Sequence, residues 1–269
     1  MQTSIQVDDG LIIDINGQAG CEIVGRPGSG KSWLATFLLL RCMQLGAFPV
    51  ICDTKRSDFY NLGKLIDQHN SRDDKYASCV AATPAQVARE LRILNKLMND
   101  RYENYNEWGK NWGDFNLRPV ILILDEYSAT IAEAGTGKDS IGAEIGNYMK
   151  QLVFKSRQMG GIFTILCSQR LNSAVLDVNI SSEFSTRIAM QNLDKVSLRL
   201  AFPQCDLDQI PYVDNIPGHG LAYSDYFGNN LPQPFVAPDL SFVDVPDVVT
   251  QLFKRYVHNS FTKESYWPF

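Results

Sequence analysis

The first segment that could do chemistry is a glycine-rich run that ends in a lysine and a serine. Gly25, Gly30, Lys31 and Ser32 have the spacing of a complete P-loop, or Walker A, motif. Glycines let the backbone N–H groups of such a loop face phosphate oxygens, the lysine meets the β- and γ-phosphates, and the serine hydroxyl binds Mg²⁺. The sequence therefore predicts a site for ATP and Mg²⁺. The residues expected to contact the nucleotide are Gly25, Arg26, Pro27, Gly28, Ser29, Gly30, Lys31, Ser32 and Trp33.

A second motif supplies two adjacent acids after an apolar run. Val120–Leu124 reads as a buried strand, and Asp125 and Glu126 follow it directly, as in a Walker B motif. We expect Asp125 to hold the Mg²⁺ shell together with Ser32, and Glu126 to orient and polarise the attacking water. The second acid favours ATP hydrolysis that drives mechanical work over the chemistry of kinases or GTPases.

Polar residues also follow two other apolar runs. Asp53 comes after Phe48–Cys52, and Gln169 comes shortly after Ile162–Cys167. Parallel strands place their carboxyl ends at one edge of a sheet, where α/β proteins bind ligands. Gln169 is therefore predicted to lie near the γ-phosphate and to sense whether it is present. An ordinary surface glutamine is the alternative.

The elements that position these residues alternate between strands and helices. Continuous apolar strands indicate a sheet that is buried on both faces. The predicted fold is an α/β, RecA-like P-loop NTPase of the ASCE class, with a mostly parallel central sheet and helices on both faces. The expected strands are Leu11–Ile15, Cys21–Val24, Phe48–Cys52, Tyr76–Val80, Val120–Leu124, Ile162–Cys167, Arg187–Gln191 and Gly220–Tyr223. The expected helices are Trp33–Leu45, Pro84 to about Tyr102, Ser140–Met159 and Val245–Val257.

The amino-acid composition is that of a globular protein and excludes some classes of function. The 269 residues are 45% hydrophobic and 20% charged, with a net charge of −5. These values exclude a mainly disordered chain and a wholly basic DNA-binding protein. Residues 203–247 hold seven Asp and no Lys or Arg, so the rest of the chain is close to neutral. The six Cys are scattered and are expected to be small core residues rather than disulfides or zinc ligands.

Several further segments, in this order along the chain, resemble the FtsK/SpoIIIE family of DNA-translocating ATPases. Besides the P-loop they are Asp53–Lys55, Met98–Tyr102, Leu124–Tyr127, Lys155–Gly161, Ile165–Arg170 and Ser185–Ala189. Within the family, the Asp-Glu-Tyr and Cys-x-Gln-Arg forms look most like the FtsK-type coupling proteins of Gram-positive conjugative elements. The resemblance extends from about Gly20 to Tyr223.

The resemblance implies a motor domain that works as a ring, usually a hexamer, and pumps double-stranded DNA. Coupling proteins of this kind deliver DNA to a relaxase-linked membrane channel, so a relaxase and channel proteins are further expected partners. Arg157 matches the family position whose guanidinium reaches a neighbouring subunit's nucleotide, with Arg187 as the second candidate. Arg157 lies twelve residues before Gln169, one residue more than is usual in the family. The pair Gly160 and Gly161 could accommodate the extra residue.

Local signals for DNA are balanced by structural alternatives. Lys150, Lys155, Arg157 and Arg170 lie in a stretch without acids, which fits either a DNA-facing surface or a solvated helix face. The segment 103–118 carries Trp108 and Trp112. Because its bases are matched by acids, we favour a packing or subunit-contact loop over base stacking.

Three function classes remain open: a DNA motor or coupling protein, which we favour, a protein-secretion ATPase of the same fold, and a nucleotide-gated scaffold. The expected organisation is an N-terminal strand extension at 1–20, the motor domain at 21–240 and a C-terminal helix and tail at 241–269. The chain is predicted to be cytoplasmic. Any membrane association is expected to come from a partner or from a further N-terminal segment.

Overall fold

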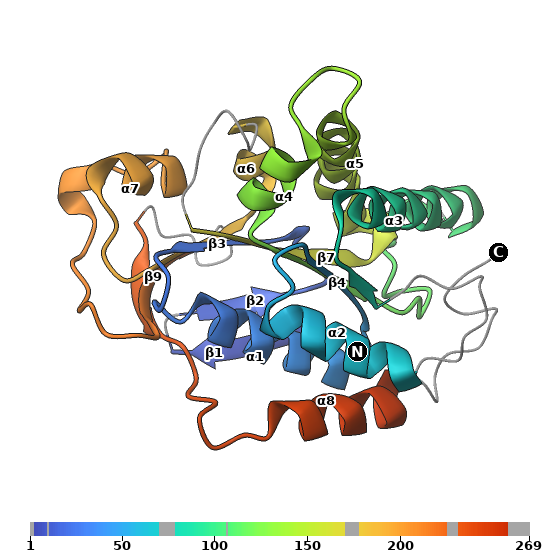
Figure 1. Cartoon of the computed structure of the whole chain (residues 1–269), viewed down its shortest axis with the longest axis horizontal. Helices are drawn as coiled ribbons and strands as arrows, with labels where there is room; N and C mark the ends of the chain where they lie inside the picture. The colour runs from blue at the N-terminus through green and yellow to red at the C-terminus, as the bar shows by residue number, and fades with distance from the viewer. Residues whose placement is uncertain are drawn as a thin grey trace.

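The structure, a computed structural model, describes residues 3–9, 11–69, 79–105, 107–169, 178–224 and 231–257. An eight-stranded sheet forms its centre (Figure 1). In spatial order the strands are β10 (Gln233–Val236), β9 (His219–Ser224), β8 (Thr186–Met190), β3 (Gly20–Gly25), β7 (Ile162–Ser168), β6 (Val120–Asp125), β4 (Phe48–Asp53) and β5 (Val80–Ala81). The strands from β8 to β5 are parallel, and β9 and β10 pair antiparallel. The predicted mostly parallel sheet is confirmed.

Helices lie on both sides of this sheet, as predicted (Figure 1). One side carries α1 (Lys31–Gln44), α2 (Asp58–His69) and α8 (Val245–Leu252), which continues into the π-helical turn η4 (Phe253–Val257). The other side carries α3 (Pro84–Tyr105), α4 (Tyr127–Ala134), α5 (Ile141–Lys155) and α6 (Val178–Glu183). Helix α7 (Lys195–Ala201) and the 3₁₀ turn η2 (Leu207–Gln209) lie near the β8–β9 end of the sheet.

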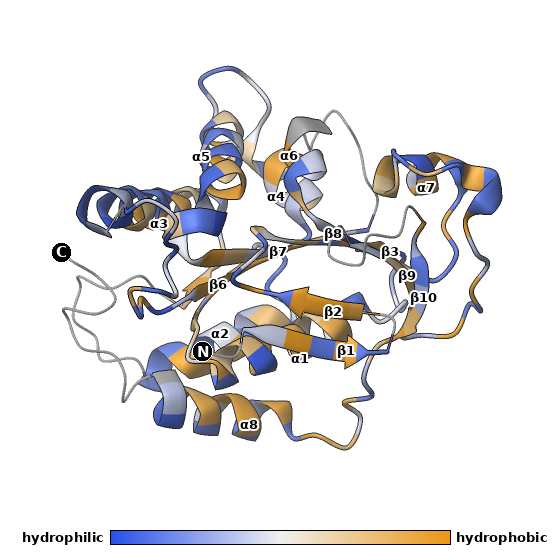
Figure 2. Cartoon of the chain, turned by 180° about the vertical axis from the view of Figure 1, so that it is seen from behind, coloured by the Kyte–Doolittle hydropathy of each residue, from blue (hydrophilic) through white to orange (hydrophobic). Residues whose placement is uncertain are grey.

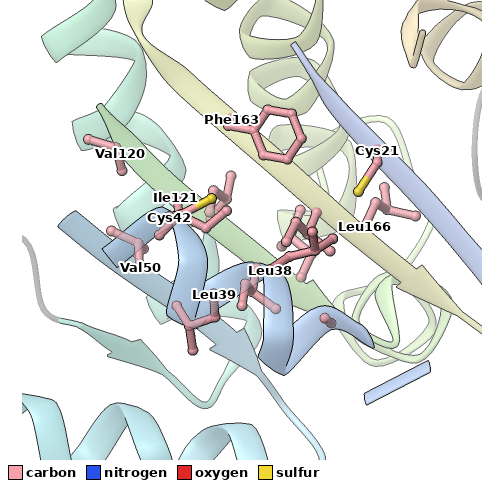
Figure 3. Close-up of a cluster of buried hydrophobic side chains, with 14 of the residues drawn as sticks. Cys21, Leu38, Leu39, Cys42, Val50, Val120, Ile121, Phe163 and Leu166 are labelled. Atoms are coloured by element: carbon pink, nitrogen blue, oxygen red, sulfur yellow. The ribbon is translucent and has the colours of Figure 1, made fainter. Parts of the chain in front are cut away.

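The core forms where α1 packs on the central strands. Figure 3 shows Leu38, Leu39 and Cys42 of α1 beside Val50, Ile121 and other strand residues. Every residue of β3, β4 and β7 is buried, which explains why these strands are mostly apolar. Burying a single Leu or Ile contributes about 1.5–3 kcal/mol, so these strands hold the fold together. All six cysteines are free thiols, and Cys21, Cys52 and Cys167 lie in the core as expected.

A small antiparallel sheet precedes the main one. It pairs β1 (Ser4–Asp8) with β2 (Leu11–Asp14), which Figure 2 shows beside α1. Ile5, Val7 and Leu11 of this hairpin are buried in the main core. The sequence reading missed β1 because its alternating apolar and polar residues leave only a short signal. No helix in the described residues is both long and apolar enough to cross a bilayer.

The segment after α3 is fastened to the start of β7. Arg101 is buried and donates hydrogen bonds to the carbonyl oxygens of Gly160 and Arg118. The backbone N–H of Trp112 donates to Gln158 O at 3.0 Å, and the Trp112 side chain is buried. The expectation of a packing loop is thus confirmed for Trp112. Trp108 is fully exposed.

Candidate nucleotide site

The P-loop joins the carboxyl end of β3 to the first turn of α1. Gly28 and Gly30 have φ values of 76° and 99°, a region that favours glycine. A Cβ on Gly30 would also lie 2.7 Å from the backbone N of Gly218, so the loop is packed tightly against the turn before β9. The Gly218 N–H donates to Ser29 O at 2.9 Å. Two parts of the chain that are far apart in sequence therefore shape the loop.

Lys31 lies in the first turn of α1, and its amine faces the loop. Its Nζ donates to Gly25 O at 2.6 Å and to Arg26 O at 3.1 Å. Burial lowers the pKa of Lys31, and the charges of Glu126 and Asp125 act in the opposite direction. These carbonyl contacts keep the ammonium group inside the loop that would hold phosphate oxygens.

The two acids of the second motif lie beside the P-loop, as predicted. Asp125 ends β6, and Ser57 Oγ donates to its Oδ2 at 3.3 Å. Burial raises the pKa of Asp125 to about 6, with the carboxylate of Asp53 as the next cause. Glu126 has left-handed backbone angles, φ 53° and ψ 59°, immediately before α4. This unusual conformation for a glutamate fits a residue held in place for function rather than for packing.

Glu126 is 8% exposed, and both of its carboxylate oxygens are engaged. Oε1 accepts a hydrogen bond from the backbone N–H of Gln169 at 3.2 Å. Oε2 lies 3.3 Å from Nζ of Lys55. Gln169 thus lies at the same edge of the sheet as Glu126, as expected for the ends of parallel strands, and its role as a γ-phosphate sensor stays a prediction. The sequence reading assigned no role to Lys55, although that residue lies just beyond the Asp53 strand end.

These residues line one cavity of about 760 Å³. Of the predicted residues, it is lined by Pro27, Gly28, Gly30, Lys31, Ser32, Trp33, Asp125, Glu126 and Gln169. Gly25 and Ser29 are buried behind the loop, and Arg26 is exposed outside the cavity. The sequence did not indicate the remaining wall, which comes from Lys55, Ser57 and Asp58, from Pro217–His219 and from Val236–Asp239. The first of these segments follows the predicted strand end at Asp53, whereas the other two are brought to the P-loop only by tertiary folding.

The residues present fit a Mg²⁺–nucleotide complex. Mg²⁺ in such sites takes one or two carboxylates, a hydroxyl, phosphate oxygens and waters. Ser32 and Asp125 offer the hydroxyl and the carboxylate. The raised pKa of Asp125 reflects burial and negative charge that a cation would offset. In the described residues no group of three or more His, Cys, Asp or Glu could hold a metal without a nucleotide.

Arg157 lies in the π-helical turn η1 (Ser156–Gly160), before β7 begins. Gln169 follows the other end of β7, and a strand of this length spans roughly 20 Å. Arg157 is exposed and does not line the cavity, which agrees with the prediction that it does not serve its own chain's site. The N–H of Gly161 donates to Ser156 O, five residues back, so the π turn accommodates the extra residue in the Arg157–Gln169 spacing.

Arg187, the second candidate for that role, is 6% exposed and held within its own chain. Its guanidinium donates to Phe184 O and to Gln204 Oε1, and it lies over the ring of Tyr223. A side chain held in this way is not free to reach a neighbouring subunit. The burial of Arg187 in β8 therefore favours a structural role for it over the role of alternative finger.

The proposed basic surface is only partly within the described residues. Lys150 and Lys155 are exposed on α5, close in sequence to Arg157. Arg170, its fourth member, lies outside the described residues.

Comparison with known proteins supports the predicted resemblance. The chain is 27% identical over 169 residues to the FtsK domain-containing protein YdcQ of Bacillus subtilis strain 168, covering 62% of this chain and 33% of YdcQ. It is 24% identical over 255 residues to the DNA translocase FtsK of Chlorobaculum tepidum, covering 90% of this chain and 30% of that protein. The chain thus spans about a third of the length of these relatives. No family model matches it.

Solved structures show the same fold. The conjugation coupling protein TcpA of pCW3, in its monomer form with ATPγS, matches with a TM-score of 0.73 at 20% identity, over 94% of this chain and 71% of TcpA. The cytoplasmic domain of the type VII secretion ATPase EccC of Thermomonospora curvata matches with a TM-score of 0.67 at 19% identity, over 92% of this chain and 30% of EccC. The chain is therefore similar to FtsK-type proteins at low sequence identity, and it has the fold of P-loop ATPases.

Proposed function

We propose that this chain is an ATP-hydrolysing motor domain that translocates or delivers double-stranded DNA. The observation that carries the proposal is the meeting of Lys31, Asp125 and Glu126 in one cavity at the carboxyl ends of parallel strands. This combination supplies phosphate binding, a metal ligand and a base for water. A site that bound nucleotide only as a structural element would not need Glu126.

The residues divide the work of hydrolysis among them. Lys31 and the N–H groups of the P-loop hold the phosphates, and Trp33 borders the same space. Ser32 and Asp125 would hold Mg²⁺, which would neutralise charge that develops on the phosphates. Glu126 accepts hydrogen bonds from the attacking water and polarises it. Gln169 lies next to Glu126. Its proposed role is to sense whether the γ-phosphate is present and to pass that state on to neighbouring segments.

Arg157 is assigned to the site of a neighbouring subunit in a ring, usually a hexamer in this family. The support is its exposure at the end of β7 opposite the chain's own cavity. A guanidinium supplied from another subunit stabilises transition-state charge only after assembly. Hydrolysis would then depend on ring formation.

Double-stranded DNA is the proposed substrate of the motor. The support is that one relative carries the name DNA translocase FtsK and that a structural match is a conjugation coupling protein. A relaxase and membrane channel proteins would be further partners of a conjugative role, with the chain on the cytoplasmic side. The match to EccC supports the second candidate function, protein secretion, because that ATPase has the same fold.

The test is ATP hydrolysis by the purified chain with and without double-stranded DNA at low and high salt. We expect DNA to stimulate turnover, and more strongly at low salt, because phosphate contacts release counterions. The Glu126→Gln variant is the blank: its residual activity measures contaminating ATPase and is subtracted. ATP hydrolysis that responds to a partner protein but not to DNA would favour secretion. No hydrolysis above the blank under any condition would contradict the motor.

A further inference from the structure

Lys55 is a second lysine in the nucleotide cavity, and the roles proposed above do not use it. It lies in the turn after β4 and lines the cavity together with Lys31, Asp125 and Glu126. Its Nζ is 3.3 Å from Oε2 of Glu126, and its side chain is 41% exposed while that of Glu126 is 11% exposed. The pair therefore joins the proposed base to a cation that faces open space in the cavity.

The turn that presents Lys55 is fixed by several hydrogen bonds. Asp53 Oδ2 accepts from the backbone N–H groups of Ser57 and Tyr60 at 2.7 and 3.0 Å, and from Ser57 Oγ at 2.7 Å. Thr54 Oγ1 lies 3.0 Å from Thr130 Oγ1 of α4. The backbone N–H of Arg56 also donates to Asp53 O at 3.3 Å. Because the turn is anchored on both sides of Lys55, we expect a change of partner to involve its flexible side chain rather than the backbone.

Lys55 lies close to where the terminal phosphate of the nucleotide would bind. A base must lie within hydrogen-bond reach of the water that attacks the terminal phosphorus, directly or through one water. If Glu126 is that base, the terminal phosphate lies beside Glu126, and Lys55 contacts the same carboxylate. Lys31 comes from the first turn of α1, where its amine is bonded to P-loop carbonyl oxygens. The two lysines thus reach the cavity from different elements, and Lys55 is the one that pairs with Glu126.

We propose that Lys55 senses the terminal phosphate by exchanging its ion pair with Glu126 for that phosphate. This inference rests on the proposed function of the site. Without a triphosphate, the ammonium of Lys55 binds Glu126 and reduces its ability to accept a hydrogen bond from water. With a triphosphate, the ammonium moves to the more highly charged phosphate, and Oε2 of Glu126 becomes available to the water. Lys55 acts on Glu126 and is thus a positioning residue as well as a phosphate ligand.

The strengths of the two contacts favour this exchange. A partly exposed ion pair shifts an equilibrium by at most about fivefold. A charge-assisted hydrogen bond to a phosphate is stronger, and its removal weakens binding by about 10- to 100-fold. Loss of Lys55 should therefore weaken the binding of a triphosphate far more than that of a diphosphate. Loss of the Glu126 charge should tighten triphosphate binding by up to about fivefold, but only while Lys55 is present.

The experiment measures the affinities of ATPγS and ADP by calorimetry, with Mg²⁺, for the wild-type chain, Lys55→Met, Glu126→Gln and the double variant. Lys64→Met is the matched control, since Lys64 is an exposed lysine on the neighbouring α2 and lies outside this cavity. We expect Lys55→Met to weaken ATPγS binding at least tenfold and ADP binding less than threefold, with neither changed by Lys64→Met. We expect Glu126→Gln to tighten ATPγS binding in the wild type and to have no effect in the Lys55→Met background.

The possible failures are distinguishable. Equal losses for ATPγS and ADP would show that Lys55 contributes only general charge, and would overturn the sensor role. The same effect of Glu126→Gln with and without Lys55 would show that the two partners do not compete, and would also overturn it. Both results leave the nucleotide site intact. A wild-type chain that binds neither ATPγS nor ADP would instead contradict the proposed function, and with it this inference.

Discussion

Replacing Glu22 with glutamine should make the protein more stable at neutral and alkaline pH. Glu22 lies in β3 between β7 and β8, is 1% exposed and has one carboxylate oxygen, Oε1, without a hydrogen-bond partner. Its other oxygen accepts from Ser181 Oγ at 2.7 Å. Burial raises the pKa of Glu22 to about 7, although Ser181 and the charge of Arg187 lower it. A glutamine oxygen can still accept the Ser181 hydrogen bond, but it never carries a charge.

The raised pKa sets both the size and the pH range of the effect. The folded state is favoured while Glu22 is protonated, so this stabilisation is complete below the unfolded pKa of 4.5 and is lost as pH rises to about 7. Each pKa unit corresponds to about 1.4 kcal/mol, which gives a cost of roughly 3 kcal/mol at pH 8 and below about 1 kcal/mol at pH 5. The buried amide of glutamine adds a pH-independent amount. The expected change between the two pH values is therefore about 2.5 kcal/mol.

Urea unfolding at pH 5 and pH 8, followed by tryptophan fluorescence, measures this difference. Taking the variant minus the wild type at each pH removes the titration of all other groups. Glu183→Gln is the matched control, because Glu183 is exposed on α6 and loses the same charge. Its difference should change by less than about 0.5 kcal/mol. An unchanged difference for Glu22→Gln would refute the reasoning. A more stable wild type at pH 8 would show that ionised Glu22 is needed by Arg187.

Three further predictions concern ATP hydrolysis. Lys31→Ala should abolish ATP hydrolysis and weaken nucleotide binding, measured by phosphate release and calorimetry; unchanged turnover would exclude the P-loop site. Glu126→Gln should still bind ATP but turn over about 100-fold more slowly, and normal turnover in single-turnover assays would reject Glu126 as the base. Arg157→Ala should bind ATP and hydrolyse it slowly, and mixing it with Lys31→Ala should restore part of the activity. A wild-type rate per subunit that is independent of concentration, with no rescue in the mixture, would contradict a shared site.

Local sequence was sufficient where one short segment determines both position and chemistry. The P-loop needs a strand, glycines with positive φ and a helix start, and all three follow one another between Gly20 and Gln44. The same holds for β6 with Asp125 and Glu126, and for β7 with Gln169. Since parallel strands end at one edge of a sheet, the sequence pattern alone predicts that the residues at these strand ends lie close together.

Other parts depend on contacts that no local pattern carries. The wall at Pro217–His219 reaches the P-loop because β9 pairs antiparallel with β8, which is the neighbour of β3 in the sheet. The turn before β9 then contacts the loop through the Gly218–Ser29 hydrogen bond. The burial of Arg187 depends on Gln204 and Tyr223, which come later in the chain. Helix α2 was missed because its apolar residues are mixed with polar ones over only twelve residues. The Lys55–Glu126 ion pair connects residues that follow two different strands, β4 and β6, and the sequence does not show which acid Lys55 contacts.

The placement of the proposed parts at two ends of the sheet limits how copies of the chain can assemble. The nucleotide cavity lies at the carboxyl ends of the parallel strands, and Arg157 lies at the amino end of β7. If Arg157 completes a neighbour's site, one end of a chain must meet the opposite end of the next. Such a contact is heterologous, so it closes into a ring or continues as a filament and does not form a two-fold dimer. Given the role that the family resemblance assigns to Arg157, its exposed position at the amino end of β7 fits a ring or a filament and does not fit a two-fold dimer.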